Sequence, residues 1–225
     1  MRPTVLAAFR AARFILLAAC LSWVWHATFS PAVNFICIVG GVLAVVPTSL
    51  IARSLLDSRP TIERAQWITT IAHVLIMFFY GVAMFKALQT YADWRFWAIP
   101  VPRGPAYALA VVAGTATFLT VANLALRGLG APFALALSQK LATSWLYNWT
   151  RNPMVLATWS WFVAIGLWLQ SVPFIAWVLF LTAPVEIAYL EIYEERELEI
   201  RFGESYRAYK AKTSFLWPKR PSAKT

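Results

Sequence analysis

The chain has 225 residues, of which 60% are hydrophobic and 13% are charged, and its formal net charge at pH 7 is +10. Soluble domains are on average about 45–50% apolar and about 25% charged, so this composition excludes a water-soluble globule and favours one membrane domain. The basic residues lie in short stretches between apolar runs and in the tail, which is typical of membrane proteins and argues against a nucleic-acid partner.

Six apolar runs have the length of membrane-spanning helices, which need about 20 residues each. In chain order, we expect spans at about residues 9–28, 32–56, 65–90, 104–126, 153–170 and 174–193. Strand-type alternation is absent, and an open sheet cannot lie in lipid. The predicted fold class is therefore all-α, a polytopic membrane helical bundle of about six transmembrane helices with a short cytoplasmic C-terminal helix.

The basic residues also predict an orientation. If the N-terminus is cytoplasmic, the outer segments contain only Lys86, Arg95 and Arg103 of the 20 Lys and Arg residues. Cytoplasmic loops of membrane proteins carry such an excess of Lys and Arg. We therefore expect an integral, multi-pass protein with both termini in the cytoplasm.

Two regions are predicted along the chain. Residues 1–126 form an N-terminal transmembrane region of about four spans. Residues 127–225 form a second region that comprises a re-entrant or interfacial connection over 127–150, a helical hairpin and a cytoplasmic tail. The tail is expected to begin after Tyr193 with a charged helix that ends at Gly203, because glycine is the usual residue just after a helix.

The chain has no residue spacing that is typical of a metal site, and none is predicted. His26 and His73 lie in different segments, and each is interpreted as a structural histidine in preference to a ligand. Cys20 and Cys37 both fall inside apolar runs and are interpreted as small core residues.

Ionisable groups cluster near the cytoplasmic end of the last span, although such groups cost roughly 2.5–3.5 kcal/mol each at membrane depth. Glu191, Glu194 and Glu195 are three and four positions apart, hence on one helical face, and Glu186 lies deeper. The hairpin returns the chain to the same membrane face, so Arg151 can meet Glu194 and Glu195. The alternative interpretation is structural: Arg151 as a membrane anchor, and the carboxylates as a solvated face.

The ordered motifs in this region resemble a known family. They read Arg151-Asn152-Pro153-Met154, a hairpin, Glu194-Glu195-x-x-Leu198-x-x-x-Phe202-Gly203-x-x-Tyr206-x-x-Tyr209 and finally Pro218. From about residue 128 to 218 the chain resembles the isoprenylcysteine carboxyl methyltransferase family and its bacterial, phospholipid methyltransferase-like relatives. The resemblance implies a cytoplasmic pocket for S-adenosylmethionine and methyl transfer to a lipid-like or small apolar acceptor that enters from the lipid bilayer.

The resemblance also implies residue roles. Arg151 would bind the cofactor's carboxylate as a bidentate fork, and Glu194 and Glu195 would accept hydrogen bonds from its ammonium and ribose hydroxyls. Arg151 and Glu195 are the expected catalytic pair. The expected cofactor-binding residues are Arg151, Asn152, Pro153, Tyr147, Glu194, Glu195 and Tyr206, and the expected substrate-binding residues are Glu186 and Glu191.

The chain departs from the family pattern around the pocket entrance. Asn152 stands where the family often has His, Val155 where it has Tyr, and Ala157 where it has Gly. Trp145-Leu146 replace the Gly-Pro that usually precedes the tyrosine. These changes motivate a second hypothesis, a non-catalytic membrane protein that retains the fold and fills the pocket with Trp145 or its neighbours. A third hypothesis, ranked lower because no cofactor signature supports it, is a membrane NADPH-dependent reductase.

Overall fold

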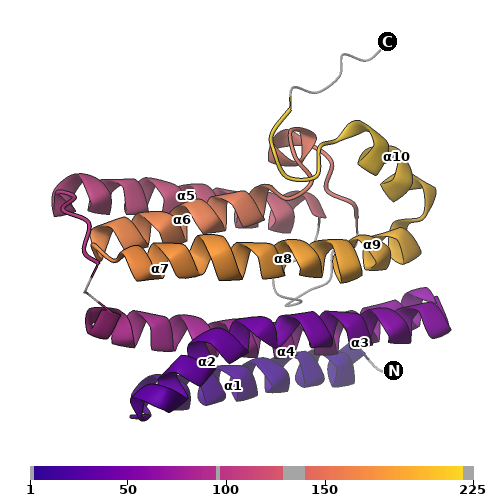
Figure 1. Ribbon diagram of the computed structural model, residues 1–225. Helices are drawn as coiled ribbons and strands as arrows, with labels where there is room; N and C mark the ends of the chain where they lie inside the picture. The colour runs from indigo at the N-terminus through magenta and orange to yellow at the C-terminus, as the bar shows by residue number, and fades with distance from the viewer. Residues whose placement is uncertain (1–2, 95–96, 129–139, 220–225) are drawn as a thin grey trace.

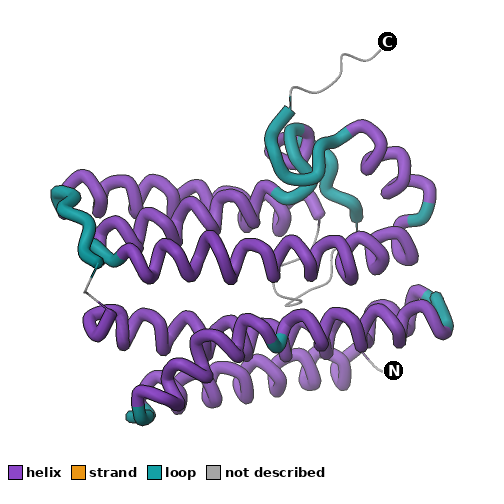
Figure 2. The backbone as a smooth tube through the Cα atoms, viewed as in Figure 1, coloured by secondary structure: helices purple, strands orange, loops and turns teal. Residues whose placement is uncertain are grey.

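The structure, a computed structural model, describes residues 3–94, 97–128 and 140–219. Its helices lie in two layers (Figure 1). One layer comprises α1 (Pro3–His26), α2 (Pro31–Leu43), α3 (Val45–Ser58) and α4 (Ile62–Thr90). The other comprises α5 (Arg103–Gly128), α6 (Pro153–Trp168) and one long composite helix. Most loops and turns lie at the ends of the helices (Figure 2).

The composite helix runs without a break through five segments. These are α7 (Val172–Trp177), η4 (Val178–Thr182), α8 (Ala183–Tyr189), η5 (Leu190–Glu194) and α9 (Glu195–Phe202). The segments η4 and η5 are π-helical turns. The charged helix that the sequence predicts after Tyr193 is therefore a direct continuation of the last apolar helix and not a separate element.

Gly203 ends the composite helix, as predicted. Its φ of 53° lies in a region that only glycine adopts readily. The chain turns there into α10 (Glu204–Lys212). The described part of the chain also contains two short 3₁₀ turns, η1 (Tyr91–Trp94) and η3 (Trp145–Asn148).

Four helical stretches are long and apolar enough to cross a membrane: Pro31–Ser58, Ile62–Asp93, Arg103–Leu124 and Val172–Phe202. Two further apolar stretches, Ile15–His26 and Pro153–Trp168, are shorter. At 1.5 Å per residue, the 16 residues of α6 extend about 24 Å, less than the hydrocarbon core of about 30 Å. The all-helical fold class is confirmed, whereas the described residues provide four membrane-length helices and not the expected six.

The connection between α5 and α6 is only partly described. Residues 129–139 lie outside the described residues, so most of the re-entrant or interfacial segment expected over 127–150 does too. What the structure describes of it is residues 140–150, including the turn η3, which lead directly into the start of α6.

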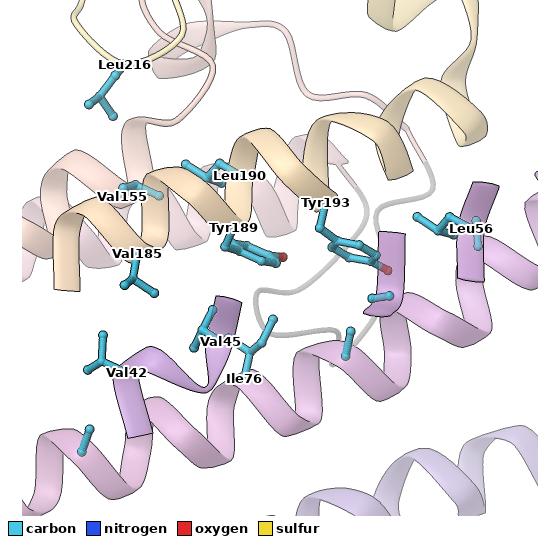
Figure 3. Close-up of a cluster of buried hydrophobic side chains, with 14 residues drawn as sticks. Val42, Val45, Leu56, Ile76, Val155, Val185, Tyr189, Leu190, Tyr193 and Leu216 are labelled. Carbon is cyan, nitrogen blue, oxygen red and sulfur yellow. The ribbon is translucent and has the colours of Figure 1, made fainter. Parts of the chain in front are cut away.

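The composite helix is joined to the first layer by a buried core that also contains two hydrogen bonds (Figure 3). Tyr189 and Tyr193 project toward the layer of α3 and α4. The Tyr193 hydroxyl lies 2.7 Å from Thr69 Oγ1, and the Tyr189 hydroxyl lies 2.8 Å from His73 Nε2. The other ring nitrogen of His73 lies 2.9 Å from the Thr69 carbonyl oxygen, so His73 has the structural role that the sequence predicts.

Candidate active site

A cavity of about 460 Å³ lies between the two layers. Its wall combines α1 and α4 from the first layer with α6, the composite helix and α10. Part of the wall is charged and includes Arg151, Glu194 and Glu195, and another part is apolar and includes Leu21 and Met84. The cavity therefore combines the two environments that a polar cofactor and an apolar acceptor would each need.

Arg151 is positioned by the C-terminal tail. Its backbone N–H donates to the Ser214 carbonyl at 2.8 Å. The side-chain amide of Asn152 donates to the Phe215 carbonyl at 2.9 Å, and the Thr150 hydroxyl donates to the same oxygen at 3.2 Å. The three residues before α6 are thus hydrogen-bonded to Ser214 and Phe215 of the tail. These bonds fix the position of the Arg151 backbone, from which its side chain extends.

Arg151 and Lys210 both contact Glu195, and we call these three residues the Glu195 cluster. Arg151 Nη2 lies 2.6 Å from Glu195 Oε1, and Lys210 Nζ lies 2.6 Å from Glu195 Oε2. Arg151 Nη1 also donates to the Lys210 carbonyl at 3.1 Å, and Lys210 Nζ lies 3.2 Å from Glu199 Oε1. The hairpin therefore brings Arg151 to Glu195, as the sequence analysis expects.

The Glu195 cluster retains unused hydrogen-bonding capacity. Arg151 Nε and Glu195 Oε1 are buried, and neither has a hydrogen-bond partner in the described part of the chain. The contact between Arg151 Nη2 and Glu195 Oε1 is close, but its angle does not meet hydrogen-bond geometry. Buried polar atoms in folded proteins are almost always paired. An amino acid group, with a carboxylate for Arg151 and an ammonium for Glu195, fits these two atoms.

Tyrosines of α10 cover the charged part of the cavity. Tyr206 is buried and lines the cavity. The Tyr209 hydroxyl donates to the Tyr147 carbonyl at 2.6 Å. Burial raises the pKa of the Tyr206 and Tyr209 phenols above the usual value, so both stay neutral and able to donate hydrogen bonds. The C-terminal helix α10 thus covers the charged part of the cavity.

A second polar group of residues lies in the part of the cavity formed by α4, α6 and α8. Glu186 Oε2 accepts a hydrogen bond from Trp159 Nε1 at 2.7 Å. The hydroxyls of Tyr80 and Thr182 also face buried surroundings and have no hydrogen-bond partner among the described residues. Glu186, Tyr80 and Thr182 line the cavity, whereas Trp159 does not and instead donates its hydrogen bond to Glu186.

The structure gathers most of the predicted site residues around one cavity. Those that line it are Tyr147, Arg151, Asn152, Glu186, Glu194, Glu195 and Tyr206. Pro153 does not line it and is buried at the first position of α6, where a missing N–H costs nothing.

Glu191 is the prediction that the structure corrects. It is exposed and is not among the cavity-lining residues, whereas Glu194 and Glu195 are. The prediction assumed α-helical spacing from Glu191 to Glu195, but η5 covers Leu190–Glu194 as a π-helical turn. Because a π-helix bonds i to i+5, each residue is rotated less than in an α-helix, so the α-helical spacing that the prediction used does not apply from Glu191 to Glu194.

Sequence reasoning missed Lys210 and Tyr80. Lys210 was counted only as part of a basic tail, although its position four residues after Tyr206 puts both on one face of α10. That spacing was the signal that would have found it. Tyr80 lies in α4, in the part of the chain where no motif is recognisable, so no sequence signal distinguished it from core aromatics.

Taken together, these features define a class. Over its described residues the chain is all-helical, with four helices of membrane-crossing length and a cavity that joins a charged cluster to an apolar wall. Residues 105–205 match the family model for phospholipid methyltransferases, the isoprenylcysteine carboxyl methyltransferase-like family. The match confirms, for these residues, the resemblance predicted from the sequence. No curated protein and no solved structure matches the chain.

The matched segment has a clear place in the fold. It begins in α5, earlier than residue 128, where the sequence resemblance begins. It includes Arg151 and Glu195 but ends before Tyr206 and Lys210. The layer of α1–α4 lies outside it, although that layer forms part of the cavity wall.

Proposed function

We propose that the protein is an integral, multi-pass membrane methyltransferase that uses S-adenosylmethionine to methylate a lipid-like or membrane-accessible acceptor. One observation carries the proposal: the Arg151–Glu195 contact at a cavity wall, inside the segment that matches a methyltransferase family. The cavity volume of about 460 Å³ is within the range of about 300–1,000 Å³ that is common for small-molecule sites.

The residues present suit the sulfonium donor. When bound, the donor supplies an electrophilic methyl group. Arg151 would hold its carboxylate with the guanidinium fork. Glu194 and Glu195 would accept hydrogen bonds from its ammonium and ribose hydroxyls, and Tyr206 would exclude water. Holding donor and acceptor aligned in a dry site accounts for most of the acceleration expected of such an enzyme.

The surfaces of the helices support a membrane location. Large apolar side chains such as Ile36, Phe118 and Phe180 are exposed on α2, α5 and η4, the last of them by 80%. Exposure of this kind on several helices suits contact with lipid. The start of α1 and the whole of α10 lie at one end of the bundle (Figure 1). With the excess of Lys and Arg at that end, this arrangement favours a cytoplasmic location for both termini.

The non-catalytic hypothesis expects a pocket that Trp145 or its neighbours fill. Trp145 is 52% exposed and is not among the cavity-lining residues, so the observed cavity counts against that hypothesis. Trp145 also has a φ of 61°, a left-handed conformation that suits glycine, the residue that the family pattern has there. The family match favours a methyl donor over the nicotinamide cofactor of the third hypothesis.

Calorimetric titration of the full chain in detergent with S-adenosylhomocysteine tests the proposal. We expect the parent protein to bind, and Arg151→Ala and Glu195→Gln each to weaken binding by about a hundredfold, as is typical when one partner of a buried charge pair is removed. Arg207→Ala and Glu204→Gln are matched controls, because these residues form an exposed ion pair on α10, and both should bind like the parent. A parent protein that does not bind the ligand would refute the proposal.

A further inference from the structure

The π-helical turn η5 sets the orientation of the two glutamates at the charged part of the cavity. Its hydrogen bond runs from the Glu195 backbone N–H to the Leu190 carbonyl, five residues earlier. Such a turn holds about one residue more than an α-helical turn, and one residue of an α-helix corresponds to about 100° of rotation. If η5 rewound as an α-helix, Glu194 and Glu195 would therefore turn by about 100° relative to the preceding helix, away from the cavity wall that they line.

A side chain of α3 contacts this turn from the other layer. Arg53 Nη1 donates a hydrogen bond to the Ile192 carbonyl, in the middle of η5, at 2.9 Å. Hydrogen bonds from a charged donor are roughly twice as strong as neutral ones. The contact therefore stabilises the winding in which the Ile192 carbonyl faces α3.

A second contact from α3 holds the composite helix just after the turn. Asp57 lies one helical turn after Arg53, and its carboxylate joins two arginines. Asp57 Oδ2 lies 2.5 Å from Arg53 Nε, and Asp57 Oδ1 lies 2.8 Å from Arg196 Nε. Arg196 directly follows Glu195 in the chain. We call Arg53 and Asp57 the α3 clamp.

We infer that the α3 clamp positions Glu194 and Glu195 for the donor. This inference rests on the proposed function. The clamp contacts Ile192 before the two glutamates and Arg196 after them, so it fixes the rotation of the helix on both sides of them. Neither residue of the clamp lines the cavity, and α3 lies outside the segment 105–205 that matches the family model. The first layer therefore shapes the donor site without contacting the donor.

The alternative interpretation is that Arg53 is only a basic anchor at a helix end, since its side chain is 38% exposed. Arg64 provides the comparison. It is also exposed, and Arg64 Nε donates to the Leu55 carbonyl at 3.0 Å. That carbonyl belongs to α3 itself and not to the composite helix. Removing each arginine in turn therefore separates the positioning of η5 from the general effect of losing an arginine–carbonyl hydrogen bond.

The first test is the affinity of Arg53→Met for S-adenosylhomocysteine, measured by calorimetry on the full chain in detergent, well below its melting temperature. We expect a loss of about tenfold, because the ligand binds only the fraction of molecules in which η5 keeps its winding. Arg53→Lys retains a charged donor and should recover most of the affinity. Arg64→Met is the matched control and should bind like the parent.

The second test needs no ligand. Hydrogen exchange of the same proteins, followed by mass spectrometry, reports local opening of the backbone. The amides of residues 190–196 should exchange several-fold faster in Arg53→Met than in the parent, and at the parent's rate in Arg64→Met. If Arg53→Met does not fold, Asp57→Asn replaces it in both tests, with changes in the same direction.

Unchanged affinity in a folded Arg53→Met protein would overturn the inference, and so would unchanged exchange over residues 190–196. An equal loss of affinity in Arg64→Met would overturn it as well, because the effect would then be one of general stability. A parent protein that does not bind S-adenosylhomocysteine counts against the proposed function, and the exchange measurement then decides by itself whether Arg53 holds the turn.

Discussion

Lys210 Nζ lies 2.6 Å from Glu195 Oε2, so an ammonium group of the chain itself occupies the carboxylate oxygen that Arg151 does not contact. The ammonium of a bound donor would compete with Lys210 for the same carboxylate group. We therefore predict that Lys210→Met tightens the binding of S-adenosylhomocysteine several-fold, because the ligand no longer displaces an internal cation. Lys212→Met, which changes an exposed lysine of the same helix, should leave the affinity unchanged. Weaker binding in Lys210→Met would mean that Lys210 assists the ligand.

The ionisation of Lys210 predicts a specific pH dependence of stability. Hydrogen bonding to Glu195, followed by that to Glu199, raises the pKa of Lys210. A raised folded-state pKa contributes stability that is fully present below the unfolded value of about 10.4 and is lost as pH rises through the folded value. The Lys210 side chain is 37% exposed, so the contribution should be below about 1 kcal/mol. In thermal melts, the small deficit of Lys210→Met should be the same at about pH 6 and about pH 9. A deficit that shrinks over that interval would contradict the assignment.

The buried Tyr193–Thr69 hydrogen bond should contribute measurably to the joining of the two layers. Tyr193→Phe leaves Thr69 Oγ1 without this partner, and buried hydrogen bonds between membrane helices contribute about 0.6 kcal/mol on average and about 1.7 at most. We expect thermal unfolding in detergent to show a loss in that range. The double variant Tyr193→Phe/Thr69→Val should recover part of it, because no unpaired hydroxyl remains. Tyr107→Phe, at an exposed tyrosine of α5, should be neutral.

Gly203 should resist substitution for reasons of backbone conformation alone. A Cβ added there would meet no atom within 4 Å, but the φ of 53° is strained for any other residue. We expect Gly203→Ala to cost about 1–3 kcal/mol and to weaken S-adenosylhomocysteine binding, because α10 carries Tyr206, which lines the cavity. Gly104→Ala is the matched control: it is equally uncrowded and lies in a helix, so alanine should be neutral or stabilising. Similar melting temperatures for the two variants would contradict this prediction.

Substitutions of Asn152 test whether its hydrogen bond to the C-terminal tail supports ligand binding. Its amide donates to the Phe215 carbonyl at 2.9 Å, whereas the carboxylate of Asn152→Asp has no proton to donate and would repel that oxygen. We expect Asn152→Asp to weaken S-adenosylhomocysteine binding by about tenfold, the usual order of effect for a lost hydrogen bond beside a charged group. Asn152→His, which restores the residue common in the family pattern, keeps a donor and should retain most of the affinity. Equal losses in both variants would contradict this prediction, because histidine keeps the donor that aspartate lacks.

The sequence predicted the pairing of Arg151 with Glu195 because two facts sufficed: a hairpin returns the chain to one membrane face, and polar groups at that depth are costly. It also predicted the glycine that ends the composite helix. In contrast, the position of Glu191 depended on the type of helical winding. Hydrophobic periodicity does not reveal a single π-helical turn, since its five residues are apolar or ionisable like those around them.

The spans illustrate a second limit. Apolar composition predicted each of the apolar helical stretches that the structure contains. It did not predict that α6, within the expected span 153–170, ends at Trp168. The cavity residues Tyr80 and Thr182 could not be predicted. Both are ordinary residues of apolar helices, and only the packing of α4 against the composite helix brings them to the wall of the cavity that Glu186 also lines.

The family model covers only part of the chain that forms the cavity wall. The matched segment contributes Arg151 and Glu195, whereas Leu21, Tyr80 and Met84 come from helices that the family model does not cover. The helices of both layers therefore build one cavity wall. Grafting a different N-terminal layer onto the matched segment would change Leu21, Tyr80 and Met84 while Arg151, Glu186 and Glu195 stayed unchanged.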